Sequence, residues 1–120
     1  MTYTWKMKEI KVKDETNSDG KVLKDAVVQT LWTKTGKDAD GNEGVFSGAT
    51  PLTAASVSES DFKALNSLTE EQVLTWIKAL VEPDATYVAH INERISKDIE
   101  DKKITQKAMP WGDPDFVPPA

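Results

Sequence analysis

Two kinds of hydrophobic spacing divide this chain near Pro51. Before Pro51, apolar residues alternate with polar ones, which is the period of a β-strand with one face in a core. After it, apolar residues recur every three or four positions, which is the period of an amphipathic helix. The pattern predicts a single α+β domain over residues 1–107, with an antiparallel β-meander (1–50) followed by two to three helices (58–104).

The N-terminal region predicts three strands joined by two polar turns. The expected strands are Tyr3–Lys13, Val22–Lys34 and Val45–Ala49. In the first strand the apolar phase slips by one residue near Lys8 and Glu9, which indicates a β-bulge that keeps both apolar sets facing the core. The middle strand is the longest, and we expect the other two strands to pair with it.

The middle strand carries apolar residues on both faces. Ala26, Val28 and Trp32 share one face, and Val27 and Leu31 share the other. A strand of this kind is expected at the centre of a sheet, covered on both sides along part of its length. The chain's own helices can cover one face. We therefore expect Val27 and Leu31 to contribute to an interaction surface for a neighbouring protein.

The clearest predicted helix begins after Thr69. Thr69 and Gln72 have the spacing of a capping box, and the Glu82-Pro83-Asp84 segment ends this helix and begins another. A short helix or turn is expected before it, over residues 58–68. The stripe of the first helix consists of Val73, Leu74, Ile77, Leu80 and Val81, with Trp76 at its edge.

The last predicted helix has a narrow apolar stripe and an otherwise charged surface. The stripe consists of Val88, Ile91, Ile95 and Ile99, and two pairs at i, i+4 spacing support the helix: Glu93–Lys97 and Asp98–Lys102. Such a stripe packs on one surface only. That surface is either the sheet or a neighbouring subunit.

The C-terminal tail, residues 108–120, holds four of the chain's six prolines. It therefore predicts an extended segment rather than helix or strand. Trp5, Trp32 and Trp76 lie on patterned elements and are expected in the core, whereas Trp111 and Phe116 lie in this tail. The two tail aromatics either fold back onto the domain or dock in a groove on a partner.

Composition excludes several classes of protein. The net charge is −5, without a basic stripe, and nucleic-acid binding requires clustered lysine and arginine to contact phosphates. No run of about 18 apolar residues is present for a membrane helix. There is no cysteine, which removes thiolate chemistry and fits a reducing compartment. We expect a soluble protein made in a cytoplasm, with no membrane or nucleic-acid partner.

No residue pattern predicts catalysis, a metal or a cofactor. The turn beginning at Asp38 has oxygen-bearing residues at alternate positions, as a calcium loop does. However, Glu43 stands where that loop requires glycine and Ala49 where it requires glutamate, which favours a simple hairpin turn. His90 is the only histidine and lacks the partners of a triad or metal motif, so we expect it at the surface or its boundary. An enzyme is not expected.

Several motifs together resemble those of a known family of small proteins. They are Tyr3-Thr-Trp-Lys, Val27-Val-Gln-Thr-Leu-Trp, Gly41-Asn-Glu-Gly, Phe46-Ser-Gly-Ala-Thr-Pro51, Leu68-Thr-Glu-Glu-Gln-Val-Leu-Thr-Trp-Ile77 and Met109-Pro-Trp-Gly112. The family is one of uncharacterised tailed-phage proteins, found in phages of cyanobacteria and other aquatic bacteria and labelled virion structural or hypothetical. The similarity covers nearly the whole chain, and the residues after Gly112 are the least typical.

The resemblance implies a phage-encoded protein that is made in the host cytoplasm and ends in the virion. Its partners would be other virion proteins or further copies of itself. It supplies no catalytic residues. The leading expectation is thus a non-enzymatic virion structural or assembly protein. The alternative is a small effector that binds a host protein during infection.

Overall fold

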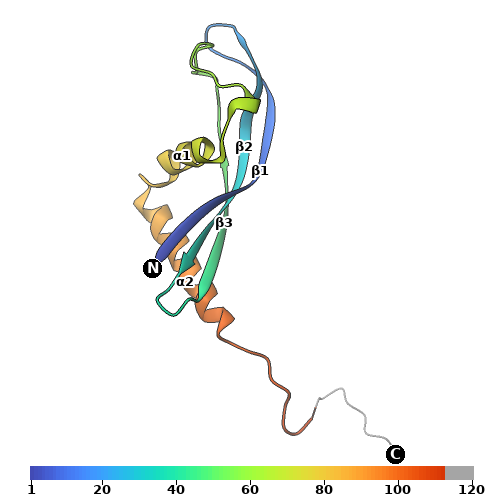
Figure 1. Ribbon diagram of the computed structural model, residues 1–120, viewed down its shortest axis with the longest axis vertical. Helices are drawn as coiled ribbons and strands as arrows, with labels where there is room; N and C mark the ends of the chain where they lie inside the picture. Colours follow the sequence, from blue (N-terminus) through green and yellow to red (C-terminus); the bar gives the residue numbers. More distant parts are fainter. Residues whose placement is uncertain (113–120) are drawn as a thin grey trace, which may run out of the picture.

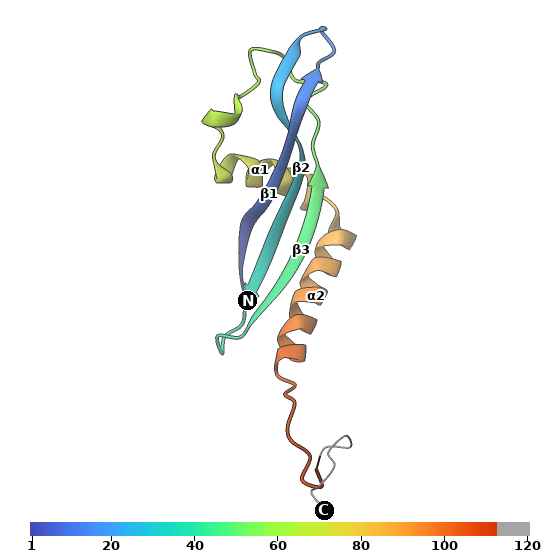
Figure 2. The same ribbon diagram turned by 90° about the vertical axis from the view of Figure 1, so that its right-hand side faces the viewer.

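A three-stranded antiparallel sheet carries both α-helices on one face (Figures 1 and 2). The computed structural model describes residues 1–112. Within that range the strands follow one another in the order β1-β2-β3. The α+β meander followed by helices is therefore confirmed. In chain order the elements are β1 (Thr2–Thr16), β2 (Val22–Lys37), β3 (Glu43–Pro51), the 3₁₀ turn η1 (Leu65–Ser67), α1 (Glu70–Val81) and α2 (Ala85–Lys102).

The predicted bulge in β1 is confirmed. The pairing of β1 with β2 shifts between Met7 and Glu9, so Lys8 has no partner in the register. Because of this extra residue, Met7 and Ile10 both lie on the side of the sheet that faces the helices, despite their odd spacing. Two further shifts follow toward the end of β1.

The core is built around Trp32 of β2, whose side chain is 1% exposed. Its ring centroid lies 4.9 Å from that of Trp5 and 5.8 Å from that of Phe46. The indole Nε1–H donates a hydrogen bond of 2.9 Å to Thr50 Oγ1, so burial leaves no unpaired donor on the ring. The helix residues buried around Trp32 are Val73, Leu74, Ile77, Val81, Ile91, Ile95 and Ile99. The narrow stripe of α2 therefore packs on the sheet.

Three glycines on the helix-facing side allow this close packing. A Cβ on Gly48 would overlap the Trp32 ring, and a Cβ on Gly44 would overlap the backbone oxygen of Ile95 in α2. A Cβ on Gly36 would lie 2.6 Å from Ile95 Cγ2. The absence of side chains here lets β3 accept the Trp32 ring and lets α2 approach the strands directly.

Both helices have a side-chain cap at their N-terminus, and that of α1 is the capping box that the sequence predicts. Thr69 and Gln72 form the capping box of α1. The Asp84 side chain caps α2 by accepting a 3.0 Å hydrogen bond from the Tyr87 N–H. Each cap satisfies backbone donors that have no partner inside the helix, and such caps are worth about 0.5–2 kcal/mol each.

Helix carboxylates also bond to the two edge strands of the sheet. Glu70 of α1 accepts a 3.2 Å hydrogen bond from the Met7 N–H of β1, and Asp98 of α2 accepts one of 2.8 Å from the Val45 N–H of β3. Asp98 also forms the predicted ion pair with Lys102, at 3.0 Å. These contacts occupy backbone donors that would otherwise be open to a further strand.

Over its central part, β2 is covered by the helices on one face only. The helices lie on the Trp32 side only, and Leu31, on the opposite side, remains partly exposed. Apart from Leu31, that side of β2 carries Gln29, Thr33 and Thr35. Thr33 is 9% exposed and the other two are partly exposed, and β-branched threonines suit a partly exposed sheet surface of this kind.

The Trp32–Gly48 contact predicts the effect of one added methyl group. Gly48→Ala should lower the free energy of unfolding by about 1–3 kcal/mol, because the ring or the strand must shift to relieve the overlap. Ser47→Ala is the matched control; Ser47 is exposed on the other face of β3 and should change stability by no more than about 0.5 kcal/mol. Urea denaturation measures both. Equal midpoints for the two variants would contradict the packing described.

The hydrogen bonds to Asp98 predict a pH dependence of stability. The bond from the Val45 N–H, and then that from Lys102, hold the pKa of Asp98 below its ordinary value of 3.8. The carboxylate of Asp98 therefore binds a proton more readily in the unfolded chain than in the folded one. Its contribution to the free energy of unfolding is present above pH 3.8 and is lost as the pH falls through the lowered pKa. Asp98→Asn should be less stable than the wild type at neutral pH, with a difference that narrows below pH 3.8.

Glu93→Gln, on the exposed surface of the same helix, is the control for that comparison. Its stability should depend on pH in the same way as that of the wild type. Denaturant midpoints over an acid pH series provide the measurement. A difference between Asp98→Asn and the wild type that stays constant down to the lowest pH would rule out the proposed role of the carboxylate.

Candidate interaction site

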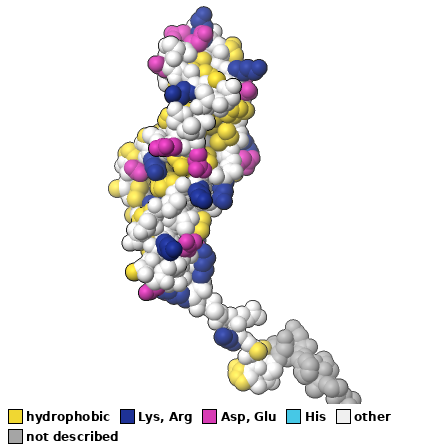
Figure 3. All heavy atoms as spheres, viewed as in Figure 1, with side chains coloured by type: hydrophobic (Ala, Val, Ile, Leu, Met, Phe, Trp, Pro, Cys, Tyr) yellow, Lys and Arg dark blue, Asp and Glu magenta, His cyan; other side chains and the backbone are white. Residues whose placement is uncertain are grey.

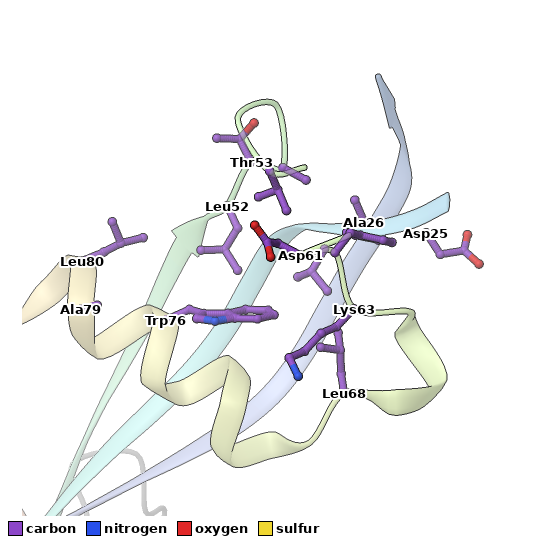
Figure 4. Close-up of a pocket in the computed structure, with 14 residues that line it drawn as sticks. Asp25, Ala26, Leu52, Thr53, Asp61, Lys63, Leu68, Trp76, Ala79 and Leu80 are labelled. Carbon is purple, nitrogen blue, oxygen red and sulfur yellow. The ribbon is translucent and has the colours of Figure 1, made fainter. Parts of the chain in front are cut away.

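An apolar cleft lies between α1 and the segment 52–68 that joins β3 to it (Figure 4). Its volume is about 480 Å³. The side chains come from three places: the early part of β2, the connecting segment and the outer flank of α1. The lining includes Ala26, Val27, Leu52, Ala54, Val57, Phe62, Leu68, Trp76, Ala79 and Leu80.

Two large side chains of α1 are left uncovered at this cleft. Trp76 is 38% exposed and Leu80 is 58% exposed. They lie four residues apart, on the same flank of the helix, beside the buried Ile77. Figure 3 shows hydrophobic side chains gathered over this region of the molecule. The expectation that Trp76 lies in the core is therefore wrong, because α1 turns this flank toward the cleft rather than the sheet.

Charged groups lie among the apolar residues of the cleft. In Figure 4 the Asp61 carboxylate projects above the Trp76 ring, and Lys63 lies on the side nearest Leu68. Asp61 Oδ2 accepts a 2.9 Å hydrogen bond from Ser58 Oγ, which helps to hold it in place. Asp25 also lines the cleft. The site thus combines a large apolar surface with a few oriented polar groups, as binding pockets commonly do.

The C-terminal segment beyond α2 carries a second exposed apolar surface. Ile104 is 77% exposed, Met109 38% and Trp111 82%. Figures 1 and 2 show the segment leaving the end of α2 and running away from the sheet and helices. In its described part, the tail therefore does not fold back onto its own domain. Phe116, the other predicted anchor, lies outside the described residues.

The predicted interaction residues are not brought together. Lys11 pairs with Gln29 and Val12 with Val27, so Val28 is an extra residue in β2 and the alternation of faces shifts there. Val27 is 8% exposed and lines the cleft, whereas Leu31 lies on the open face of the sheet. In the sequence, the feature that points to the cleft is a pair of large apolar residues, Trp76 and Leu80, at i, i+4 spacing on the predicted helix.

A buried lysine forms the most unusual polar cluster in the core. Lys34 is 6% exposed, and its ammonium donates a 2.8 Å hydrogen bond to Asn92 Oδ1 and lies 4.2 Å from the Tyr3 ring centroid and 5.1 Å from that of Trp5. Burial lowers the pKa of Lys34, and this effect is partly opposed by the Glu82 carboxylate. The amide and the two rings replace part of the lost hydration, so the cluster has a structural explanation.

The remaining candidates occupy ordinary structural positions. Asp38 accepts hydrogen bonds from the N–H groups of Asp40 and Asn42, at 3.0 and 2.8 Å, as expected of a hairpin turn. His90 is exposed, as predicted, with its ring edge-on to Phe46. Within residues 1–112 no group of three or more histidine, cysteine, aspartate or glutamate side chains is placed to hold a metal ion. No helix of that range is long and apolar enough to cross a membrane.

Fold and site together define a small α+β domain that offers two apolar surfaces, the cleft and the tail. Residues 1–111 match a family described as a domain of unknown function, DUF7936, and the chain belongs to that family. No curated protein and no solved structure matches the chain. The family match includes Met109 and Trp111, so the exposed tail up to Trp111 is part of the family's domain.

The exposures of the four tryptophans predict how iodide quenches the fluorescence of dilute protein. Trp111 should be the most quenchable and Trp32 the least, because iodide reaches only solvent-exposed rings. Trp111→Phe should therefore remove the largest quenchable component, while Trp5→Phe, at a partly buried position, should largely retain it. A quenchable fraction unchanged by Trp111→Phe would show that the tail is packed against protein.

Proposed function

We propose that this chain is a non-enzymatic structural or assembly protein that acts through protein–protein contacts. The observation that carries the proposal is the 82% exposure of Trp111 on a segment that extends away from the domain. A large ring in this position contributes nothing to the packing of its own domain. Its presence within the family's matched range supports a role in binding a partner.

The energetics of burial support this role. A tryptophan buries about 150–250 Å² in a well-packed site, which at about 25 cal/mol per Å² corresponds to about 4–6 kcal/mol before the entropy of binding is subtracted. Tryptophan is also among the residues most enriched at the centres of protein interfaces. An extended segment with one such anchor suits a groove on another protein.

Hydrogen bonds from the helices to both edge strands favour a contact made by side chains. Glu70 and Asp98 bond to backbone donors of the two edge strands, which disfavours uncontrolled pairing of strands between molecules. The cleft and the tail are exposed apolar surfaces that suit such a contact. A protein that assembles in many copies benefits when pairing between sheet edges is disfavoured and apolar side chains are left for the specific contact.

The resemblance of the sequence motifs to tailed-phage proteins supports a place in a phage particle. The proposed partners are other virion proteins or further copies of this chain, met in the host cytoplasm during assembly. Mass spectrometry of purified particles tests the location. A protein that is abundant in infected cells and absent from the particles would contradict it.

Removal of the tail tests the proposed contact itself. Deleting residues 108–120 should leave the melting temperature of the isolated domain unchanged and abolish its incorporation into particles. Deleting only 113–120 is the matched control: it retains Trp111 and should preserve incorporation. A lower melting temperature with incorporation retained would show that the tail stabilises its own domain.

A further inference from the structure

The cleft and the tail are both exposed apolar surfaces, and the cleft is large enough to take a side chain of the tail. The cleft is an apolar hollow of about 480 Å³ with two large side chains left uncovered, and the tail presents uncovered apolar side chains on an extended backbone. Pockets that hold compact ligands have volumes of about 300–1,000 Å³, so the cleft can accommodate an indole ring and an adjoining side chain. The cleft lacks a covering side chain, and the tail lacks a pocket for its aromatic ring.

From this complementarity we infer that residues 103–112 of one copy bind in the cleft of a neighbouring copy, with Trp111 as the anchor. The inference rests on the proposed function and names its partner: a second copy of this chain. In the complex the Trp111 ring lies against Trp76 and Leu80, and the remaining tail residues run along the segment 52–68.

Polar groups favour the same arrangement. Buried indoles normally donate their N–H to an acceptor, and the Asp61 carboxylate projects into the cleft above the Trp76 ring. Residues 103–112 contain two lysines and no acidic residue, whereas the cleft has two carboxylates, Asp25 and Asp61, against one lysine. Lys107, four residues before Trp111, can therefore approach the rim of the cleft with favourable electrostatics.

The length of the tail makes a second copy the partner rather than the same chain. The tail begins at the end of α2 far from α1, and the cleft lies beyond the other end (Figures 1 and 2). The 18 residues of α2 extend about 27 Å. The nine residues from 103 to 111 span at most about 30 Å when fully extended. To reach its own cleft, the segment would have to reverse at once and run fully stretched along the whole helix.

A tail-into-cleft contact joins two different surfaces of the same protein. Such a heterologous contact repeats from copy to copy and generates a ring if the rotation closes, or a filament if it does not. It leaves one free tail and one free cleft at the ends of every open assembly. This asymmetry separates it from a two-fold dimer, in which both copies use the same surface.

Complementation between two defective variants tests the inference. Trp111→Ala removes the anchor and keeps the cleft; Leu80→Glu places a charge in the cleft and keeps the tail. Sedimentation velocity over a wide range of concentration should show the wild type self-associating and each variant weakened by at least about tenfold. A mixture of the two variants should form dimers and nothing larger, because only one functional junction can form in each pair.

Val22→Glu is the matched control. Val22 is 64% exposed and belongs to neither the cleft nor the tail, so the same charge should leave self-association at the wild-type level. Circular dichroism checks that each variant is folded. If Leu80→Glu fails to fold, Trp76→Leu provides a further change to the same cleft and should weaken association as Leu80→Glu does.

Two results would overturn the inference. One is a wild-type protein that stays monomeric at millimolar concentration. The other is self-association that persists in both variants, or is lost in both without being restored by mixing them. A further outcome separates this inference from the proposed function. If the wild type is monomeric and the Trp111→Ala variant is not incorporated into particles, the proposed function stands and the partner of the tail is a different protein.

Discussion

The contact between the Trp32 indole and Gly48 is the one on which the rest of the domain depends. The ring occupies the space that a side chain on β3 would otherwise fill, and it gives both helices a common surface for packing. Its hydrogen bond to Thr50 fixes its orientation. Gly36 and Gly44 also lack side chains on the surface that faces α2, so Ile95 packs directly on the strands. One aromatic ring and three glycines thus determine which face of the sheet is buried.

This arrangement has a consequence for the surface. The two helices pack on the side of the sheet that carries Trp32. The opposite side is polar enough to remain in contact with water. The outer flank of α1 then has no partner within the domain, and Trp76 and Leu80 line an open cleft. The described part of the tail leaves Ile104 and Trp111 exposed. The interaction surfaces are therefore a result of how the core is built.

Local chemistry made much of the fold predictable from the sequence. The bulge at Lys8 follows from a slip in the alternation, and the start of α1 follows from a cap whose two residues are three positions apart. The stripe of α2 indicated its buried side, although not the surface on which it packs. Each of these features depends on neighbours in the chain, which a pattern records directly.

The interaction site was only partly predictable, because it depends on contacts between distant residues. A second bulge, at Val28, places Val27 in the cleft and leaves Leu31 on the open face, which a simple alternation cannot reveal. The exposure of Trp76 depends on how α1 crosses the strands and on where the segment 52–68 runs. Trp111 lies outside every helix and strand that the sequence predicts, and its ring is exposed in the structure, while its role as an anchor stays a prediction.

The most direct measurement for the central claim uses the indole N–H signals of the four tryptophans in a ¹⁵N-resolved NMR spectrum recorded at increasing protein concentration. If Trp111 of one copy binds beside Trp76 of another, these two signals will shift or broaden together, while the signal of the buried Trp32 stays in place. A Trp111 signal that remains at its free position at every concentration would contradict the account. So would a shift of Trp111 with Trp76 unaffected.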